Sequence, residues 1–369
     1  MATAFLPGCG GSAPAPRPEA AADRPAEETA GDGPAAAGSG LRRIILLTNG
    51  NSPFWDACRS GLQDAARELN LADDGLQAVM EVNDGTPQGQ LDKLRQYGTQ
   101  SDIAAIGISV IDAANAAIAD EMRKLRKKGV HVITIDSDID REKYRDARYV
   151  FLGTDNLAAG RVLGQCAATL LPEGGKYVTF VGRTGAQNAI DRVGGFADGA
   201  GDEFERLDNM ADDVDLDRAR DNVRNAMINH PELNLLVGIW SYNAPAIVDV
   251  VRDTKSRERV KVVAFDAEPG AVKQMSEGMI DALLVQNPYE MGYRGVRVMQ
   301  ALVKDDRQTL AEVYPRLDQP DGDISDTGLK VIAPDGETPL KAGQFPEGVQ
   351  FLRLEEFRGW LSEYGLEGS

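Results

Sequence analysis

The feature that most constrains the fold of this chain is a regular alternation of short apolar runs and longer amphipathic stretches between residues 41 and 304. The short runs are rich in β-branched residues and predict strands, whereas the longer stretches have the apolar spacing of helices. The predicted strands cover residues 41–48, 76–82, 103–109, 130–135, 149–153, 176–181, 206–210, 234–239, 260–265 and 280–285. The predicted helices cover residues 54–70, 88–98, 113–128, 157–170, 187–205, 215–229, 244–254, 268–277 and 289–304. Such alternation is typical of a parallel sheet with helices on both faces.

The alternation forms two consecutive arrays. A loop rich in charged residues, 138–148, follows the fourth predicted strand, and the pattern then restarts at residue 149. The length of 369 residues suits two domains of ordinary size. We therefore predict an α/β chain with two doubly wound, parallel-sheet lobes. Residues 305–350 are rich in Pro, Gly and Asp and predict one strand at 329–332, and an amphipathic helix is predicted at about 354–364.

The first forty residues differ in composition from the rest. Residues 10–40 are mostly Ala, Pro, Gly and acidic residues with almost nothing to bury, which predicts a disordered tether. Before them, Phe5-Leu6-Pro7-Gly8-Cys9-Gly10 resembles the end of a bacterial lipoprotein signal, although the charged and apolar regions of such a signal do not precede it. We expect lipidation at Cys9, and no run of the sequence is long enough to span a membrane.

The charge balance restricts the partners of the chain. Its formal net charge is −18, so a nucleic-acid backbone or an anionic membrane surface would repel it. We predict no nucleic-acid partner and membrane contact only through the lipid anchor. Asp136, Asp138 and Asp140 begin like a calcium loop, but Arg141 stands where Gly is needed and no Glu follows at the twelfth position. We therefore predict no metal site there.

The cysteines, histidines and short motifs offer no catalytic machinery. Cys58 and Cys166 lie in predicted helices as small core residues, and a disulfide between them stays open. His131 and His230 belong to no metal-ligand cluster. The phosphate-binding Gly-x-x-x-x-Gly-Lys-Ser/Thr, the dinucleotide-binding Gly-x-Gly-x-x-Gly after a strand and the Gly-x-Ser-x-Gly elbow are all absent. We predict that the chain is not an enzyme and holds no cofactor.

Polar and aromatic residues follow the ends of the predicted strands, where ligands bind in open parallel sheets. These segments are Asn49-Gly50-Asn51-Ser52-Pro53-Phe54-Trp55, Asp136-Ser137-Asp138, Gly182-Arg183-Thr184-Gly185, Trp240-Ser241-Tyr242-Asn243, Asp266-Ala267-Glu268 and Gln286-Asn287-Pro288. Amides and carboxylates satisfy pairs of sugar hydroxyls, and aromatic faces pack on the C–H face of a sugar ring. Helix capping explains any single polar residue, but it does not need Trp55, Trp240 or Gln286.

These segments also carry a family resemblance over residues 41–304. The motifs are Asn51-Ser52-Pro53-Phe54-Trp55, Ile133-Thr134-Ile135-Asp136, Gly153-Thr154-Asp155-Asn156, Arg192-Val193-Gly194-Gly195-Phe196, Val263-Ala264-Phe265-Asp266 and Gln286-Asn287-Pro288. Each motif is weak alone, but the ordered set at these spacings resembles the ribose-binding-protein family of type I periplasmic receptors. That resemblance implies a sugar-binding receptor of an ABC importer in the cell envelope, which works as a monomer with permease subunits as partners.

The resemblance also implies the lobes and the site. A three-segment hinge would divide the chain into a lobe of 41–153 and 287–325 and a lobe of 154–286 and 326–369, with 1–40 as the lipoprotein-like N-terminus and tether. The ring would stack on Phe54 and Trp55, and hydroxyls would bind the polar residues. The implied ligand-binding residues are Asn51, Ser52, Phe54, Trp55, Asp136, Ser137, Asp138, Arg192, Trp240, Ser241, Asn243, Asp266 and Gln286.

The sequence departs from the family pattern at two places, and three other functions stay open. Ser137 stands where ribose and galactose receptors carry Arg, and Asp-Ser-Asp is more similar to the branch that binds rhamnose or furanosyl signalling molecules. In the segment 240–243, either Ser241 or Asn243 could stand for the Asn that the family usually carries there.

A receptor that presents ligand to a sensor kinase or chemoreceptor would share the fold. Repressors of the lac-repressor type would need a basic helix-turn-helix, which the N-terminus lacks, and an enzyme is the third alternative.

Overall fold

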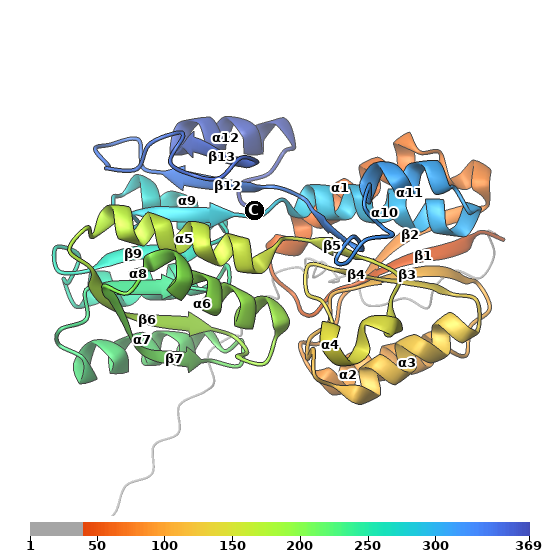
Figure 1. Cartoon of the computed structure of the whole chain (residues 1–369), viewed down its shortest axis with the longest axis horizontal. Helices are drawn as coiled ribbons and strands as arrows, with labels where there is room; N and C mark the ends of the chain where they lie inside the picture. The colour runs from red at the N-terminus through yellow and green to blue at the C-terminus, as the bar shows by residue number, and fades with distance from the viewer. Residues whose placement is uncertain (1–39) are drawn as a thin grey trace, which may run out of the picture. The chain divides into compact units, whose positions relative to one another are not determined.

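The computed structural model describes residues 40–369, which contain two separate β-sheets (Figure 1). Cys9 and nearly all of the expected tether lie outside the described residues. The first sheet is six-stranded in the order β11-β5-β4-β3-β1-β2, and the second is seven-stranded in the order β13-β12-β10-β9-β8-β6-β7. We call each sheet with its covering helices a lobe. The sequence-based prediction of an α/β fold with two doubly wound, parallel-sheet lobes is confirmed, apart from one antiparallel pair of strands.

The first lobe is a fully parallel sheet between two layers of helices. Its strands are β1 (Arg42–Leu47), β2 (Leu76–Glu81), β3 (Ile103–Ile108), β4 (His131–Ile135), β5 (Phe151–Gly153) and β11 (Ile324–Asp326). Its longer helices are α1 (Phe54–Glu68), α2 (Pro87–Tyr97), α3 (Ala116–Lys127) and α10 (Pro288–Lys304). Every residue of β3 is buried, because helices cover both of its faces. Apolar residues of α1 and α10 pack in one core cluster, and those of α2 and α3 pack in another.

The second lobe repeats this arrangement with a larger sheet. Its strands are β6 (Gly175–Val181), β7 (Phe204–Ala211), β8 (Leu235–Gly238), β9 (Lys261–Phe265), β10 (Ala282–Val285), β12 (Leu329–Ala333) and β13 (Val349–Arg353). Its helices are α5 (Asn156–Leu170), α6 (Gln187–Ala200), α7 (Leu216–Asn229), α8 (Asn243–Asp253), α9 (Pro269–Ser276) and α12 (Leu354–Glu363). The core cluster that includes residues of α5 and α6 is separate from the one that includes residues of α7, α8, α9 and α12.

One strand departs from the parallel pattern. β12 pairs antiparallel with β10, whereas β13 pairs parallel with β12. The chain explains this direction, because β11 runs parallel to β5 and leaves the first lobe at the carboxyl edge of its sheet. The chain therefore enters the second lobe at the carboxyl edge of β10, and β12 has to run the opposite way.

The chain passes between the two sheets at residues 154–155, 286–287 and 327–328. Hydrogen bonds tie these connections together. The Thr154 hydroxyl donates to Gln286 Oε1 at 2.9 Å, and the Thr327 backbone N–H and hydroxyl donate to the Gly153 carbonyl at 2.8 and 3.0 Å. The Asp155 N–H donates to Asp326 Oδ2 at 2.6 Å. Three segments far apart in sequence therefore lie side by side where the lobes join.

The close packing of α5 on α6 positions Arg192. A Cβ at Gly160 in α5 would lie 2.4 Å from the backbone oxygen of Arg192 in α6, so only glycine permits this approach. The Asn156 side chain at the start of α5 then accepts a hydrogen bond from Arg192 Nε at 2.8 Å. The helix pair thus holds both the backbone and the side chain of Arg192.

Several sequence-based boundaries were wrong. The predicted helix 187–205 ends at Ala200, because Gly201 adopts a φ of +86°. The predicted helix 113–128 begins at Ala116, where the Asn115 side chain caps it.

Residues 305–350 contain more than the single expected strand. The sequence missed α11 (Arg307–Val313), β11 and β13, and also the short α4 (Arg141–Tyr144) and the 3-10 turns Leu71–Asp74 and Arg145–Ala147.

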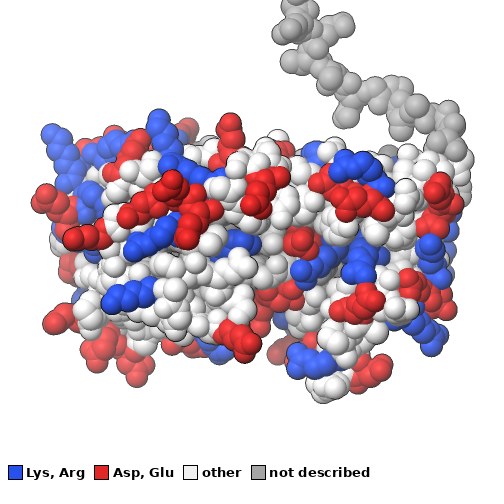
Figure 2. All heavy atoms as spheres, turned by 90° about the horizontal axis from the view of Figure 1, so that it is seen from above, with Lys and Arg blue, Asp and Glu red and all other residues white. Residues whose placement is uncertain are grey.

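The cysteines, possible metal ligands and surface charges were also considered in the sequence, and the structure shows how they are arranged. Cys58 and Cys166 are free and buried, so the disulfide that the sequence left open does not form. Within residues 40–369 no cluster of His, Cys, Asp or Glu could hold a metal ion, and none of the helices there has the length and apolar character of a membrane span. On the face seen in Figure 2, acidic and basic side chains are interspersed.

Candidate functional site

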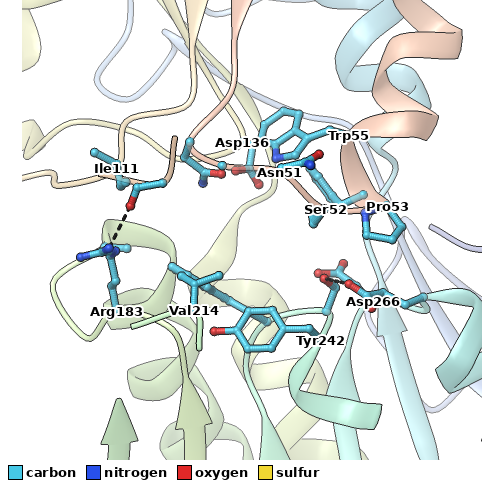
Figure 3. Close-up of a pocket in the computed structure, with 18 of the residues that line it drawn as sticks. Asn51, Ser52, Pro53, Trp55, Ile111, Asp136, Arg183, Val214, Tyr242 and Asp266 are labelled. Carbon is cyan, nitrogen blue, oxygen red and sulfur yellow. Dashed lines mark hydrogen bonds between the residues drawn. The ribbon is translucent and has the colours of Figure 1, made fainter. Parts of the chain in front are cut away.

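A cavity of about 670 Å³ lies between the lobes, beyond the carboxyl ends of the parallel strands. Residues that follow β1, β2 and β4 form its wall in the first lobe. Residues that follow β6, β8 and β9 form the opposite wall, and Gln286 after β10 lies where the lobes join. Figure 3 shows these walls facing each other, with Asn51, Trp55 and Asp136 on one side and Tyr242 and Asp266 on the other.

Asp136 and Asp266 occupy equivalent positions in the two lobes. Asp136 directly follows β4 with a φ of +66°, and Asp266 directly follows β9 with a φ of +62°. Aspartate tolerates this left-handed conformation better than most residues, and such strained positions concentrate at functional sites. The N–H of each residue bonds to the next strand, to Leu152 and Leu284 respectively. Both carboxylates are buried and line the cavity.

Arg192 lies among these carboxylates with one nitrogen unused. Its Nη1 donates to the Ile239 carbonyl at 2.9 Å and lies 3.9 Å from Asp266 Oδ2. Its guanidinium stacks over the Phe265 ring at 4.3 Å. The side chain is buried, yet Nη2 has no hydrogen-bond partner among the described residues. A buried guanidinium donor needs an acceptor, which a ligand in the cavity can supply.

Gln286 connects the site to the segments between the lobes. Its Oε1 accepts the hydrogen bond from Thr154, and its Nε2 donates to Asp266 Oδ1 at 2.9 Å. These two bonds fix the orientation of the amide. They also leave Asp266 Oδ2 free to accept a bond from a ligand.

Burial dominates the electrostatics of the acidic groups. It raises the pKa of Asp136 to about 6, although the charge of Arg192 and the bond from the Ser109 hydroxyl at 2.8 Å act in the opposite direction. Burial also raises the pKa of Asp266, again against the charge of Arg192 and the bond from Gln286. The two aspartates repel each other across the cavity, which adds to the raised pKa of Asp136.

Aromatic side chains supply the apolar part of both walls. Phe54 and Trp55 begin α1 and meet edge to face, with ring centroids 5.1 Å apart. On the opposite wall, Trp240 Nε1 donates to Asn188 Oδ1 at 3.3 Å, and the Tyr242 hydroxyl donates to Asp212 at the back of the wall. These bonds satisfy the polar ends of the rings and leave their apolar faces for a ligand.

One hydrogen bond crosses the cavity mouth. Arg183 follows β6 in the second lobe, and its Nη2 donates to the Gly85 carbonyl of the first lobe at 2.8 Å (dashed line in Figure 3). Gly85 adopts a φ of +82°, a conformation that favours glycine. This bond links the lobes on the side of the cavity away from the connecting segments.

Most of the residues that the sequence nominated come together around this cavity. Those that line it are Asn51, Ser52, Phe54, Trp55, Asp136, Arg192, Trp240, Ser241, Asp266 and Gln286. They come from segments that are more than two hundred residues apart in the chain. They lie together because the two sheets present their carboxyl edges to the same space.

Ser137, Asp138 and Asn243 do not line the cavity. Asp138 is buried in an ion pair with Arg148 at 2.6 Å, which holds the pKa of Asp138 below its usual range. Asn243 donates from Nδ2 to Asp212 at 3.0 Å, so it supports the wall from behind. The sequence could not separate them, because the backbone turns after each strand and only part of each segment faces inward.

Other lining residues were not nominated from the sequence. The main polar ones are Asn83, Arg183, Asn188, Tyr242 and Glu268. Asn83 follows β2 and satisfies the same strand-end rule. Asn188 lies in the first turn of α6 and had no such signal. Arg183, Tyr242 and Glu268 lie in segments that the rule had already marked.

Comparison with known proteins places this geometry in a family. The sequence model of the periplasmic binding protein domain matches residues 44–307. The D-allose-binding periplasmic protein of Escherichia coli (strain K12) is 23% identical over 262 residues, covering 69% of this chain and 82% of that protein. The ribose import binding protein of Salmonella typhimurium is 22% identical over 267 residues, covering 71% and 85%.

Solved structures share the fold. An ABC transporter solute-binding protein from Burkholderia graminis, solved with D-arabinose, has a TM-score of 0.69 at 23% identity and covers 80% of this chain and 96% of that one. A glucose-galactose binding protein from Geobacillus stearothermophilus has a TM-score of 0.68 at 23% identity and covers 79% and 97%. The match to the family model spans well over half of the sequence, and it coincides with the strands and helices that build the cavity. The chain therefore belongs to the periplasmic binding protein domain family, and it is a binding protein and not an enzyme.

Proposed function

We propose that this chain is the sugar-binding receptor of an ABC importer and that the sugar binds in the cavity between the lobes. The observation that carries the proposal is the opposition of Asp136 and Asp266 around Arg192, whose Nη2 has no partner among the described residues. Together they offer acceptors from both lobes and one donor to the same small volume. A sugar hydroxyl can use both, because it donates and accepts at once.

The contacts of the sugar follow from the free atoms of the site. Hydroxyls would donate to Asp136 Oδ1 and Asp266 Oδ2, since Ser109 and Gln286 already occupy the other carboxylate oxygens. A third hydroxyl would accept from Arg192 Nη2. Trp55 and Trp240 would pack on apolar ring faces. The allose-binding and ribose import relatives support a small sugar as the ligand class.

We further propose that binding closes the lobes. The moving bodies would be 41–153 with 287–325, and 154–286 with 326–369, and the connections between them would act as hinges. A ligand that contacts Asp136 and Asp266 touches both bodies, so it favours the closed state by its higher affinity for that state. The Arg183–Gly85 bond would form on closure and shield the sugar from water.

The cellular setting is part of the same proposal. The receptor would work as a monomer in the periplasm or cell envelope, held there by a lipid on Cys9, and would deliver its sugar to permease subunits. The family match supports the envelope location. A receptor that presents sugar to a sensor protein would bind in the same way, so purification with either a permease or a sensor kinase separates these roles.

Native mass spectrometry of the protein as purified tests the ligand class. We expect an adduct with the mass of a monosaccharide, which gentle unfolding removes. Calorimetric titration with D-ribose, D-allose, D-arabinose and D-galactose should then give at least one saturable one-site isotherm. If no adduct appears and no sugar of this panel binds at millimolar concentration, the proposed function is wrong.

A further inference from the structure

The buried part of the cavity carries more negative than positive charge. Its acidic groups are Asp136 in the first lobe and Asp266 and Glu268 in the second, and its buried cation is Arg192. The Asp136, Asp266 and Arg192 side chains are almost fully buried, and Glu268 is half-buried. With all three carboxyls ionised, this group of residues has an excess of two negative charges.

Arg192 compensates the aspartates but not Glu268. The charge of Arg192 lowers the pKa of both Asp136 and Asp266 against the effect of burial. For Glu268, burial and the charge of Asp266 both raise the pKa, and only the hydrogen bond from Ser241 opposes them. That bond runs from the Ser241 hydroxyl to Glu268 Oε1 at 2.7 Å. Within residues 40–369 no Lys, Arg or His forms an ion pair with Glu268, and Oε2 accepts no hydrogen bond.

The other cations that line the cavity are engaged elsewhere. Arg183 donates to the Gly85 carbonyl at the mouth. Arg220 pairs with Asp217 at 3.3 Å and with Asp249 at 3.1 Å. The lining residues Asp84 and Asp213 add further negative charge, although Asp213 pairs with Arg218. The wall around Glu268 therefore has no cation of its own to balance the carboxylate.

We propose that the ligand is a sugar or polyol that carries a protonated amine, and that this amine pairs with Glu268. The inference rests on the proposed function, because it concerns the same cavity. A desolvated carboxylate is costly unless it is paired, and a cationic partner forms the stronger, charge-assisted hydrogen bond. An ammonium offers three donors, so it can bond to Glu268 Oε2 and still reach a neighbouring acceptor such as Asp266 Oδ2. The same field repels sugar acids and sugar phosphates.

Matched sugar series test this inference by calorimetry at pH 7. Each series keeps one ring and changes only the charge: D-glucose, D-glucosamine and D-glucuronate, and then D-galactose, D-galactosamine and D-galacturonate. We expect the amino sugar of the better-binding series to bind at least tenfold more tightly than its neutral parent, and the acid not to bind. Tenfold corresponds to about 1.4 kcal/mol.

A variant assigns the preference to one carboxyl group. In Glu268→Gln the affinity ratio of amino to neutral sugar should fall to about one. The matched control is Glu258→Gln, which removes the same charge from an exposed position of the same lobe and should keep the wild-type ratio. Because a variant can fail to fold, the wild-type ratio is also measured from pH 7 to pH 5. It should fall as Glu268, Asp136 and Asp266 take up protons, while Arg192 keeps its charge.

The outcomes separate this inference from the proposed function. Equal affinity for neutral and amino sugars, tighter binding of the acid, or a preference that survives both Glu268→Gln and acidification would each overturn the amine while leaving the sugar receptor intact. If no member of either series and no sugar of the earlier panel binds, the proposed function fails and the inference falls with it.

Discussion

At the scale of single residues, Asp266 connects the cavity to the segments between the lobes. It follows β9 in a left-handed conformation, accepts from Gln286 and faces Arg192 across 3.9 Å. Gln286 in turn accepts from Thr154, so the carboxylate is one bond away from two of the connections between the lobes. In the proposed mechanism, a sugar bound to Asp266 would lie next to the segments that bend.

Replacing Asp266 with alanine should weaken sugar binding strongly. Truncating a charged partner in a desolvated site typically costs about 2–5 kcal/mol, which is roughly thirtyfold or more in affinity. Stability without ligand should change little, because relief of the buried carboxylate is offset by loss of the hydrogen bond from Gln286. Calorimetry and urea unfolding measure the two effects. Asp253→Ala, at an exposed carboxylate outside the cavity, should leave both unchanged, and an Asp266→Ala protein that binds like wild type would contradict the site.

The ionisation of Asp136 should be visible in the stability of the ligand-free protein. Its folded-state pKa of about 6 lies above the unfolded value near 3.9, so the folded state holds the proton more tightly. The stability that comes from this proton is full below pH 4 and is lost as the pH rises through 6. Asp136→Asn should therefore gain about 1–3 kcal/mol over wild type at pH 7.5, measured by urea unfolding, and the gain should vanish at pH 4. A gain that is independent of pH would show that Asp136 is not the titrating group.

At the scale of elements, the paired helices α5 and α6 decide where Arg192 lies. Their contact depends on Gly160, where an added Cβ would meet the Arg192 carbonyl oxygen at 2.4 Å. The helices would have to separate to accept a methyl group, and the Asn156–Arg192 hydrogen bond would then be strained. The packing of α5 on α6 thus controls a donor that faces the cavity.

Gly160→Ala should destabilise the protein by about 1–3 kcal/mol, as overpacking does, and should also weaken sugar binding. Thermal unfolding and calorimetry follow the two effects. Gly194→Ala in α6 is the matched control, because a Cβ there meets nothing within 4 Å. Alanine favours a helix over glycine, so this control should be neutral or more stable by up to about 1 kcal/mol. Equal effects of both changes would mean that the close contact is unimportant.

The strands and helices also show what the sequence could and could not predict. Periodicity located the strands β1 to β10 and the longer helices between them, because these strands are continuous apolar runs and these helices show a spaced apolar pattern. It missed β11 and β13, which are only partly buried and lie among turn residues, so that their pairing with β5 and β12 decides them. In the site, the strand-end rule found Asp136 and Asp266 but could not exclude Asp138, whose partner Arg148 is set by tertiary packing.

At the scale of the whole molecule, charge repulsion and hydrogen bonds between the lobes act in opposite directions in the absence of ligand. Asp136 and Asp266 repel across the cavity and favour separation of the lobes. The Arg183–Gly85 bond and the tied connecting segments favour approach. In the proposed mechanism, a sugar that donates to both aspartates would relieve the repulsion, and part of its binding free energy would favour closure.

Arg183→Ala removes the hydrogen bond from that side chain to the Gly85 carbonyl of the other lobe and should shift the equilibrium towards the open state. A hydrogen bond of this kind contributes about 0.5–1.5 kcal/mol, so sugar affinity should fall roughly two- to tenfold. The loss should appear mainly as faster dissociation, followed by stopped-flow fluorescence of Trp55 and Trp240. Arg206→Ala, on the exposed surface of the same lobe, is the control. Unchanged dissociation in Arg183→Ala would mean that the contact does not hold the closed state.

A crystal structure of the protein with the sugar that binds it in calorimetry is the most direct test of this account. We predict density for one sugar between the lobes, with hydroxyl or amine groups within hydrogen-bond distance of Asp136, Asp266 and Arg192 Nη2, and with a ring face against Trp55. Density for the sugar outside this cavity, or inside it but in contact with only one lobe, would contradict the central claim.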